Sequence, residues 1–551
     1  MNEASTTDRA MRHQQWLVQL DAALRSQGLE AAGRLALQAV DDGVEHPGVL
    51  NLAASAHFNS NRFEEALQLL RRAEIFAPND SKLLNSIGIC LKSLGRPDEA
   101  HTAFDRALEI DPNMASAHFN RGLLLEELKY SKAARSDYER AAALDPNQLE
   151  SLARVAWLDA QSGDTASART QAERVLTRSA SNVVARMALS FADLQEGRLD
   201  AAAARLSELS RDPALEEDNR IIVLGLVGDL RDAEGRPAEA FAAYQESNAR
   251  LKAANAARFE VPGAVTPLDQ VKRLTKWFEA ADPRLWREPL TGQAGTADAR
   301  THVFLVGFPR SGTTLFENVL AAHPDVVSLE ERDCLESASA DYLASPEGLM
   351  RLARIEPLEA ERQRTAYWSR VRKHGVDPRG RVFIDKMPLA SVALPLIAKL
   401  FPDALILFAR RDPRDVVLSC FRRRFGMNPS MYQLLTLEGA AAYYDCVMRL
   451  SEIYRQLLPL PQHLVRYEKL VEDFEVTARA ACDFLGLEWD QALFDFAAKA
   501  RSRGIATPSA PQVVRGLNRE GQGVWRRYRE QMAPVLPLLE PWVQRFGYDP
   551  T

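Results

Sequence analysis

The stretch that decides the fold of the second half of the chain is VFLVGFPRSGTTLFENVL, residues Val303–Leu320. Its first residues, Val303–Val306, form a short apolar run, which is typical of a buried parallel strand. The turn Gly307–Gly312 follows and leads into a helix that we expect to begin near Thr313. This arrangement surrounds one concavity with backbone N–H groups and a helix amino terminus, which favours an anion. Arg310 adds a fixed fork of donors, so the stretch predicts an anion-binding loop.

The loop lacks the cation that nucleotide-hydrolysing loops carry. In the pattern G-x-x-x-x-G-K-[ST] a lysine follows the second glycine. Here Thr313 stands in its place. A phosphate-binding loop without that lysine favours a different ligand, so a nucleotide kinase or another phosphotransferase is a disfavoured alternative.

A second strand-to-helix unit of the same kind lies further along the chain. Ala404–Phe408 has the pattern of another buried strand and continues into ARRDPRDVVLS. Arg411 therefore follows the carboxyl end of a strand, where open α/β sheets bind ligands. Ser419 lies eight residues beyond Arg411, roughly two turns into the next helix. We expect Arg411 and Ser419 to bind a ligand, whereas the run Arg422–Arg424 is typical of a solvated helix face.

The first half of the sequence repeats with a 34-residue period. Three prolines and six alanines keep this spacing: Pro78, Pro112 and Pro146, and Ala32, Ala66, Ala100, Ala134, Ala168 and Ala202. The unit Ser81–Met114 contains two apolar helical patterns separated by the turn Gly95–Pro97. Each unit is therefore predicted to be a helix pair, in which the recurrent alanine allows the two helices to pack closely.

These patterns predict an α + α/β fold in three parts. Residues 1–255 are expected to form an all-α repeat domain, and residues 301–551 an α/β domain with a central parallel sheet. Between them, residues 256–300 lose the period and gain prolines and small polar residues, which is typical of a linker. A helix of about Leu268–Ala281 is expected to bridge the two domains.

Composition excludes several classes of protein. The chain has 551 residues, a net charge of -6 and a pI near 6.0, which argues against nucleic acid as a partner. Its five cysteines are far apart, so we expect neither a disulfide framework nor a metal cluster. No apolar run is long enough for a membrane span, and the amino terminus lacks the apolar core of a signal peptide. We therefore expect a cytoplasmic protein with no metal.

The helix pairs resemble the tetratricopeptide repeat, which has the same period and the same helix-turn-helix unit. Such pairs stack into a superhelix with a concave face. The resemblance therefore implies a protein or peptide partner bound through the repeat groove. The alternative is a scaffold that only positions the second domain.

The second half resembles the sulfotransferases that use 3′-phosphoadenosine 5′-phosphosulfate (PAPS), and most closely the tyrosylprotein sulfotransferases. The matching stretches are VGFPRSGTTL, AAHPDV, the pair Glu330–Glu331, DKMP, LFARRDPRDVVLS, VRYEKLV, TPSAPQV and the closing FGYDP. The resemblance implies a P-loop-like α/β fold, PAPS as co-substrate without a metal, and transfer of a sulfuryl group to an acceptor hydroxyl.

The same resemblance implies a role for three groups of residues. Those implied to hold the 5′-phosphosulfate are Arg310, Ser311, Gly312, Thr313 and Thr314. Those implied to hold the 3′-phosphate are Arg411 and Ser419, with Tyr467 as a further nucleotide contact. The implied catalytic residues are Glu331 as the base, with Lys386 and Ser509 near the bridging oxygen and the sulfuryl oxygens.

The chemistry of the reaction agrees with these residue types. In-line sulfuryl transfer needs a base for the acceptor hydroxyl and a cation for the negative charge that grows on the leaving phosphate. Glu331 and Lys386 meet the two needs, and Glu330 stays open as the base. His323 lies where a helix is expected to end, so we expect it to cap the last carbonyls rather than act as the base.

The resemblance is weakest on the acceptor side. The tyrosylprotein enzymes carry arginines two and six residues beyond the base, and these meet acidic residues around the target tyrosine. Here those positions are Asp333 and Ser337, with Arg332 as a candidate substitute. Protein tyrosine is the acceptor that we expect. The alternatives are a carbohydrate or small-molecule hydroxyl and, in a different class, a nucleotide-binding repeat scaffold without turnover.

Overall fold

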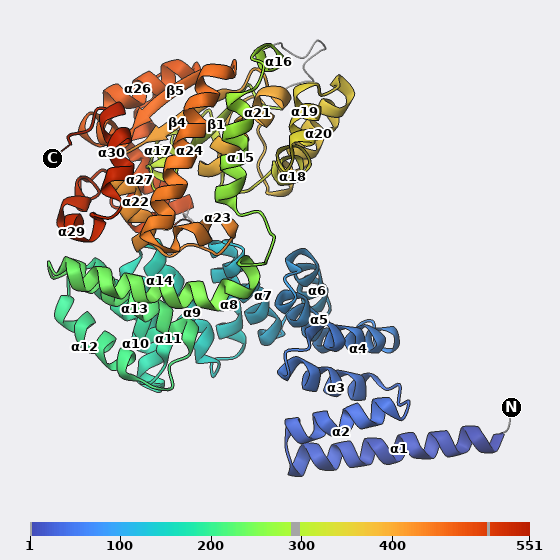
Figure 1. Cartoon of the computed structure of the whole chain (residues 1–551). Coiled ribbons are helices and arrows are strands. Elements are labelled where there is room, and N and C mark those ends of the chain that lie inside the picture. Colours follow the sequence, from blue (N-terminus) through green and yellow to red (C-terminus); the bar gives the residue numbers. More distant parts are fainter. Residues whose placement is uncertain (1–2, 288–297, 504–506, 508, 551) are drawn as a thin grey trace. The chain divides into compact units, whose positions relative to one another are not determined.

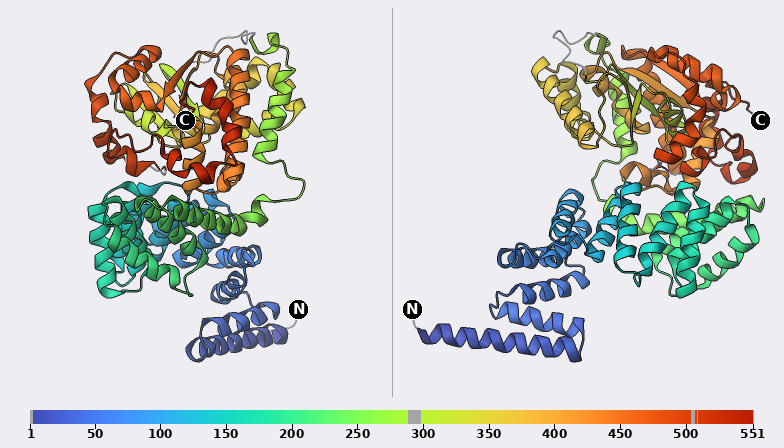
Figure 2. Two further views of the ribbon diagram at one scale, coloured as in Figure 1. Left: turned by 60° about the vertical axis from the view of Figure 1, so that its left-hand side comes forward. Right: turned by 180° about the vertical axis from the view of Figure 1, so that it is seen from behind.

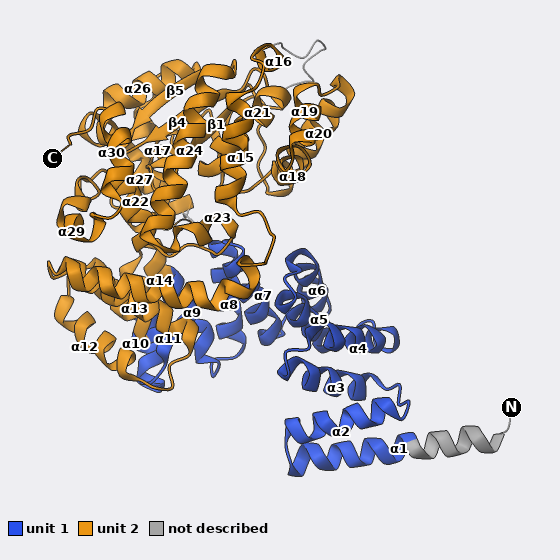
Figure 3. Cartoon of the chain, viewed as in Figure 1, with its two compact units in different colours: residues 1–158, 170–185 blue, residues 159–169, 186–551 orange. Residues whose placement is uncertain are grey.

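The computed structural model describes residues 3–287, 298–503, 507 and 509–550. Its contacts divide the chain into two compact units, residues 1–158 with 170–185 and residues 159–169 with 186–551 (Figure 3). The predicted boundaries after residues 255 and 300 stay predictions. Residues 288–297 of the predicted linker lie outside the described residues.

Helix pairs follow one another through the repeat region (Figure 1). The helices are α1 (Glu3–Ser26), α2 (Leu29–Asp41), α3 (Pro47–Asn59), α4 (Phe63–Phe76), α5 (Ser81–Ser93), α6 (Pro97–Ile110), α7 (Ala115–Glu127), α8 (Ser131–Leu144), α9 (Leu149–Ser162), α10 (Thr165–Arg178), α11 (Val183–Gln195), α12 (Leu199–Arg211), α13 (Glu217–Ala233) and α14 (Pro237–Phe259). The six recurrent alanines are all 0% exposed, as expected for residues at which two helices meet. Gly88 has the same role in α5, because a Cβ atom there would lie 2.5 Å from the ring of Phe104.

The second unit contains a five-stranded parallel sheet. Its strands are β1 (Thr301–Gly307), β2 (Val326–Glu330), β3 (Val382–Lys386), β4 (Leu405–Arg410) and β5 (Gln462–Arg466). They lie in the order β2-β3-β1-β4-β5, and every neighbouring pair is parallel. The predicted fold class, helical repeats followed by an α/β domain with a central parallel sheet, is confirmed.

Many helices and short 3₁₀ turns surround this sheet (Figures 1 and 2). The helices are α15 (Pro267–Glu279), α16 (Arg284–Arg287), α17 (Thr313–Leu320), α18 (Glu336–Leu343), α19 (Pro346–Ala353), α20 (Pro357–Lys373), α21 (Leu394–Leu400), α22 (Pro413–Arg422), α23 (Pro429–Tyr432), α24 (Leu437–Leu457), α25 (Tyr467–Glu472), α26 (Phe474–Leu485), α27 (Phe496–Arg503), α28 (Ala510–Val513), α29 (Arg529–Met532) and α30 (Leu536–Arg545). The 3₁₀ turns are η1 (Pro388–Ala393), η2 (Gln433–Leu435), η3 (Gln491–Asp495) and η4 (Val524–Tyr528).

The sheet is covered on both faces because alternate side chains of each strand point to opposite sides. On β1, Phe304 and Val306 join an apolar core with α15, α20, α21, α22 and α24. Val303 and Leu305 point the other way and pack with α17, α26 and α27. The strands are therefore buried on both sides, which explains why their sequences are continuously apolar. Helix α15, which covers the residues expected to form a bridging helix, buries Phe278 in the first of these cores.

The second unit also contains α13 and α14, which pack against the end of α22. Arg422 donates to Asp232, and Tyr528 donates to the same carboxylate over 2.7 Å. Arg423 pairs with Asp229 at 3.3 Å. The expectation that Arg422 and Arg423 lie on a solvated face is therefore wrong. The reason is that α13 supplies carboxylates that no local sequence pattern connects with α22.

Removing the carboxylate of Asp232 is expected to destabilise the second unit. Because the side chains of Asp232 and Arg422 are both nearly buried, Asp232→Ala leaves a guanidinium unpaired and should lower the free energy of unfolding by about 3 kcal/mol. Urea unfolding measures the change. Asp21→Ala, which breaks an exposed pair with Arg25 on α1, is the control and should change stability by less than about 0.5 kcal/mol. Equal effects of the two substitutions would contradict the prediction.

Among the described residues, no helix combines the length and the apolar character that a membrane crossing requires.

Candidate active site

The predicted site residues gather at one edge of the sheet because the strands are parallel and in register. Lys386, the last residue of β3, lies beside Leu305 of β1 and Glu330 of β2. On the other side of β1, Arg410 at the end of β4 lies beside Arg466 at the end of β5. The segments that follow all five strands therefore leave from the same edge.

A crevice is expected at this edge between β1 and β4. The helix after β1, α17, packs on one face of the sheet, and the helix after β4, α22, packs on the other. Neighbouring parallel strands whose helices depart to opposite faces leave a crevice at their carboxyl ends, and this is where open α/β sheets bind ligands.

The loop between β1 and α17 has an unusual backbone. Gly312 precedes α17 with φ 94°, and a Cβ atom there would lie 2.9 Å from the ring of Tyr467. Arg310 adopts φ 70° although it is not glycine. A left-handed non-glycine residue costs about 1–3 kcal/mol, and such residues are enriched at functional sites. The loop therefore holds the Arg310 side chain in a direction that an unstrained backbone would not provide.

Arg310 is surrounded by neutral hydrogen-bond partners. Its Nε donates to Ser419 Oγ over 3.0 Å, and its Nη1 donates to Ser509 Oγ. In the described part of the chain, no carboxylate forms an ion pair with it. Burial, together with the nearby charges of Arg423 and Arg411, lowers the pKa of Arg310 to about 9. A guanidinium in this setting is stabilised by any anion that binds beside it.

Arg411 joins the same cluster from the other side. Its Nη1 donates to the backbone oxygen of Arg310 over 3.0 Å, and its Nη2 donates to the backbone oxygen of Gly521. Its guanidinium lies 4.7 Å from the centre of the Tyr467 ring. The Nε atom is buried and has no hydrogen-bond partner within the described residues. The structure thus brings Arg310, Arg411, Ser419, Ser509 and Tyr467 into one connected group.

The other polar residues of the first loop and of the start of α17 are buried. Ser311, Thr313 and Thr314 are all buried. The backbone N–H of Ser311 donates to Phe308 over 3.1 Å, and the hydroxyls of Thr314 and Thr507 lie 3.2 Å apart. Pro508, within the stretch TPSAPQV, lies outside the described residues.

Lys386 lies in a cluster of carboxylates. Its side chain is 0% exposed, and its Nζ lies 2.7 Å from Glu331, 3.4 Å from Glu317 and 3.7 Å from Glu330. Burial works against the charge of Lys386, but the three carboxylates outweigh burial and raise its pKa above the usual value. Lys386 therefore stays an ammonium ion over the physiological pH range.

The two neighbouring glutamates differ in exposure and backbone. Glu331 is closer to Lys386, 40% of its side chain is exposed, and its φ is 45°. Glu330 is the last residue of β2, and only 19% of its side chain is exposed. Glu331 thus follows the strand directly with a left-handed backbone, and its carboxylate is the more exposed of the two.

Known proteins match both halves of the chain. The sulfotransferase family model matches residues 302–491, and the tetratricopeptide repeat model matches residues 17–81 and 91–148. Protein-tyrosine sulfotransferase 1 of Danio rerio is 30% identical over 276 residues, which cover 45% of this chain and 72% of that protein. The chain belongs to the sulfotransferase family. Protein-tyrosine sulfotransferase 2 of Gallus gallus is 29% identical over 274 residues, which cover 45% of this chain and 69% of that protein.

Two further proteins are similar to parts of the chain. An uncharacterized protein of Aquifex aeolicus (strain VF5) is 26% identical over 252 residues, but these are 43% of this chain and only 32% of that protein. A tetratricopeptide repeat protein structure from Parabacteroides merdae covers 44% of this chain and 93% of its own at 13% identity, with a TM-score of 0.35. That score is too low to support an inference about function.

In the sulfotransferase domain His323 is part of the framework. Its Nδ1 accepts a hydrogen bond from the backbone of Asp325, so its Nε2 carries the proton and donates to the backbone oxygen of Glu488. Both ring nitrogens are therefore used, and neither is left to accept a substrate proton. The histidine does not cap its own helix as expected, because α26 and the residues after it bring a carbonyl from a distant part of the chain.

Sequence reasoning missed Glu317, which lies inside α17 and reaches Lys386. The signal was present, because Glu317 is the one charged residue in the helix TTLFENVL, all of which is buried. It also missed Gly521, whose backbone oxygen accepts from Arg411. No local pattern could have shown that contact, because the two residues are separated by 110 positions.

The acceptor side of the sulfotransferase domain differs from the expected pattern of arginines. Asp333 accepts from the backbone of Leu335, and Ser337 Oγ accepts from Arg370 Nη2 over 2.6 Å. The Nη1 of Arg370 donates to the backbone oxygen of Cys334. An arginine from α20 thus lies beside a position where the resemblance led us to expect an arginine from the loop itself.

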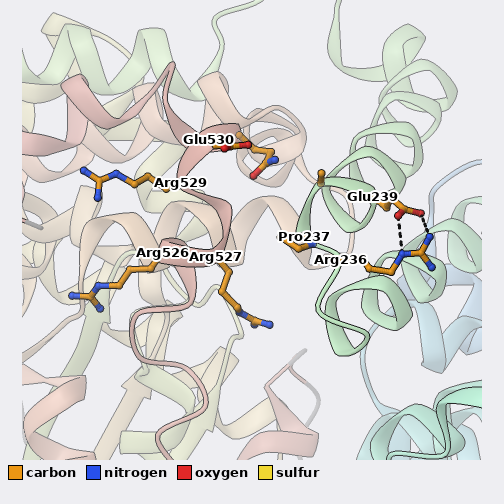
Figure 4. Close-up of a pocket in the computed structure, with 9 residues that line it drawn as sticks. Arg236, Pro237, Glu239, Arg526, Arg527, Arg529 and Glu530 are labelled. Carbon is orange, nitrogen blue, oxygen red and sulfur yellow. Dashed lines mark hydrogen bonds and ion pairs between the residues drawn. The ribbon is translucent and has the colours of Figure 1, made fainter.

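A cavity of about 500 Å³ lies away from this edge of the sheet (Figure 4). It is lined by Arg236, Pro237, Ala238, Glu239, Arg526, Arg527, Arg529, Glu530 and Gln531. None of the predicted site residues is among them. Its arginines are largely neutralised, since Arg236 is bonded to Glu239 and Arg527 is paired with Asp232.

Proposed function

We propose that this sulfotransferase moves the sulfuryl group of PAPS to an acceptor hydroxyl, namely that of a protein tyrosine. The observation that carries the donor assignment is the contact between the two predicted anion-binding loops. Arg310 donates to Ser419, and Arg411 donates to the backbone of Arg310. A ligand with a phosphate group at each end of one nucleoside can therefore be held by both loops at once.

The chemistry of the group supports PAPS as its ligand. Among the described residues, Arg411 Nε is buried without a hydrogen-bond partner, and Arg310 forms no ion pair with a carboxylate. Both therefore gain a partner when an anion binds. The residues that would hold PAPS are those that the sequence predicts: Arg310, Ser311, Gly312, Thr313, Thr314, Arg411, Ser419 and Tyr467. PAPS would supply the sulfuryl group and a phosphate leaving group, and no metal is needed for that transfer.

The catalytic residues then have separate tasks. Glu331 Oε accepts the proton of the acceptor hydroxyl, a role that its exposed side chain suits better than the more buried Glu330. Lys386 stays charged and offsets negative charge on the leaving side. Because Ser509 Oγ accepts from Arg310, its own hydroxyl proton is left to donate to the transferring group.

The acceptor is proposed from the relatives. Those named protein-tyrosine sulfotransferases are 25–30% identical to this chain over 45% of its length, which supports protein tyrosine. A carbohydrate or small-molecule hydroxyl is favoured instead by Asp333 and Ser337, because they replace the arginines of the tyrosylprotein pattern. The repeat region is proposed to bind a protein or peptide partner. A cytoplasmic location stays a prediction of the sequence.

Titration with nucleotides tests the donor assignment. We expect 3′,5′-diphosphoadenosine to bind at least about 100-fold more tightly than ATP with magnesium. This factor corresponds to a difference of roughly 2.8 kcal/mol in binding free energy. The physical reason is that the group around Arg310 and Arg411 matches two separated phosphates, whereas Thr313 leaves the loop without the lysine of triphosphate sites. Isothermal titration calorimetry measures both affinities. Tighter binding of ATP with magnesium would favour a phosphotransferase.

The acceptor is found by incubating the protein with labelled PAPS and a fractionated lysate. Label that enters protein as tyrosine sulfate supports the proposal. If the label enters only glycans or small molecules, the acceptor is one of these and not protein tyrosine. Binding of the nucleotide without any transfer would support the non-catalytic scaffold.

A further inference from the structure

The two carboxylates closest to Lys386 differ in their exposure to solvent. Glu331 is exposed at the edge of the sheet, whereas Glu317, on α17, is 0% exposed. The Nζ–Oε2 distance to Glu317 is 3.4 Å. The Lys386–Glu317 pair is thus buried on both sides, and the Lys386–Glu331 pair can open to solvent.

The pairing of Lys386 with Glu331 alone would create a difficulty for the proposed reaction. When Glu331 accepts a proton it loses its charge, and a buried ammonium that has lost its counter-charge is strongly destabilised. The lysine would then tend to give up its own proton or to move. A second carboxylate that does not take part in proton transfer removes this difficulty, because it keeps a negative charge beside Lys386.

Glu317 has the environment that such a carboxylate needs. Its Oε1 accepts from Ser328 Oγ over 2.9 Å and lies 3.4 Å from Arg503 Nη2. Its Oε2 has no hydrogen-bond partner among the described residues and is the oxygen nearest to Lys386. These contacts fix one oxygen and direct the other at the lysine. Because Glu317 lies four residues after Thr313 in α17, the two residues share a helix face.

The charges around Lys386 come from several elements. Glu330 and Glu331 approach from the end of β2, and Glu317 approaches from α17. Arg503 of α27 lies on the far side of Glu317. Asp385, which precedes the lysine on β3, accepts a hydrogen bond from Tyr367 on the other face of the sheet. Three carboxylates thus face the lysine itself.

We propose that Glu317 is a positioning residue, which keeps Lys386 charged and in place while Glu331 takes the proton of the acceptor hydroxyl. The inference rests on the proposed function and adds a residue that the sequence comparison does not assign. In this scheme one proton moves, from the acceptor oxygen to Glu331 Oε. Lys386 keeps all three of its ammonium protons, and Glu317 stays ionised throughout.

The test compares the wild-type protein with Glu317→Gln by isothermal titration calorimetry with 3′,5′-diphosphoadenosine. Titrations at pH 7 and pH 9.5, in buffers of different ionisation enthalpy, measure the protons taken up on binding. Removing a carboxylate lowers the pKa of a nearby lysine. We therefore expect little difference at pH 7. At pH 9.5 we expect added proton uptake and weaker binding in the variant than in the wild-type protein, because burial then acts on Lys386 with one counter-charge fewer.

Activity measurements give an independent readout. In Glu317→Gln the alkaline limb of the pH profile of kcat should move to lower pH by at least about one unit. The KM for PAPS at pH 7 should stay within about twofold of the wild-type value, because the polar contacts of the Glu317 side chain among the described residues are with Lys386, Ser328 and Arg503 and not with Arg310 or Arg411. A purely structural role would lower activity at all pH values alike.

Controls separate the possible failures. Glu452→Gln alters a similarly buried carboxylate, which pairs with Arg410, Arg455 and Arg545 outside the site, and should leave proton uptake unchanged. If Glu317→Gln does not fold, the comparison of Lys386→Met with the double variant Glu317→Gln/Lys386→Met decides the question, because the double variant removes both members of the fully buried pair. Equal kcat values in these two variants support action through Lys386, and a much lower value in the double variant overturns it.

The outcome also distinguishes this inference from the proposed function. A wild-type protein that does not bind 3′,5′-diphosphoadenosine overturns the proposed function. Wild-type binding together with unchanged proton uptake and an unchanged pH profile in Glu317→Gln overturns only the role of Glu317.

Discussion

Glu331→Gln is expected to lower kcat by about 10²–10⁴-fold, the range that a general base contributes. Glutamine has nearly the same shape as glutamate but cannot accept the proton of the acceptor hydroxyl. The KM for PAPS should change little, because the proposed donor contacts are made by Arg310 and Arg411, which contact each other and not Glu331. Initial rates at saturating acceptor and varied PAPS measure both quantities.

Two variants control the Glu331 prediction. Glu330→Gln removes the neighbouring carboxylate, which is less exposed and 3.7 Å from Lys386, and its kcat should fall far less. His323→Ala removes a side chain whose two ring nitrogens are bonded to backbone, so it should affect stability more than turnover. If His323→Ala abolishes turnover while Glu331→Gln leaves it intact, the assignment of the base is reversed.

Arg310→Gln is expected to weaken the binding of 3′,5′-diphosphoadenosine by at least about 30-fold, since losing one partner of a buried hydrogen-bonded charge pair costs about 2–5 kcal/mol. The fold should survive, because Arg310 has no carboxylate partner in the described part of the chain that its loss would leave unpaired. Its neighbours Ser419 and Ser509 are neutral hydroxyls that can bond to glutamine or water. Calorimetric titration measures the affinity, and circular dichroism checks the fold.

Arg479→Gln is the matched control for Arg310. Arg479 lies on α26 in an exposed pair with Glu475, so its replacement should leave the affinity within about twofold and the stability within about 0.5 kcal/mol of wild type. An affinity loss in Arg310→Gln no larger than in Arg479→Gln would remove the first loop from the donor site. If only Arg411→Gln lowers the nucleotide affinity, the second loop alone stays in the proposed donor site.

The end of α22 connects the donor site with the last helices of the repeat region. Ser419 contacts Arg310, and Arg422, one helical turn later, is bonded to Asp232 of α13. The substitution Asp232→Ala therefore probes a contact close to the donor site as well as the stability of the second unit. Its effect on nucleotide affinity can be measured in the same titrations as those of Arg310→Gln.

Local sequence patterns predicted the fold class correctly, and they singled out residues that the structure brings together around Arg310. The repeat is visible because each helix pair needs the same small alanine at the same spacing, and the structure buries all six of these alanines. The strands β1 and β4 are visible because a strand buried on both faces is continuously apolar. The loop after β1 is visible because a left-handed backbone beside Tyr467 requires glycine at position 312. All of these are local patterns.

Only the tertiary structure decided which charges meet. Glu317 reaches Lys386 because β3 lies beside β1 and α17 folds back over that face of the sheet. Arg422 is neutralised by Asp232, and His323 is held by a carbonyl from Glu488, across 190 and 165 positions of the chain. The physical reason is that an ion pair or a hydrogen bond depends on distance in space. For residues this far apart, strand order and helix packing set that distance, and the spacing of residues along the sequence does not.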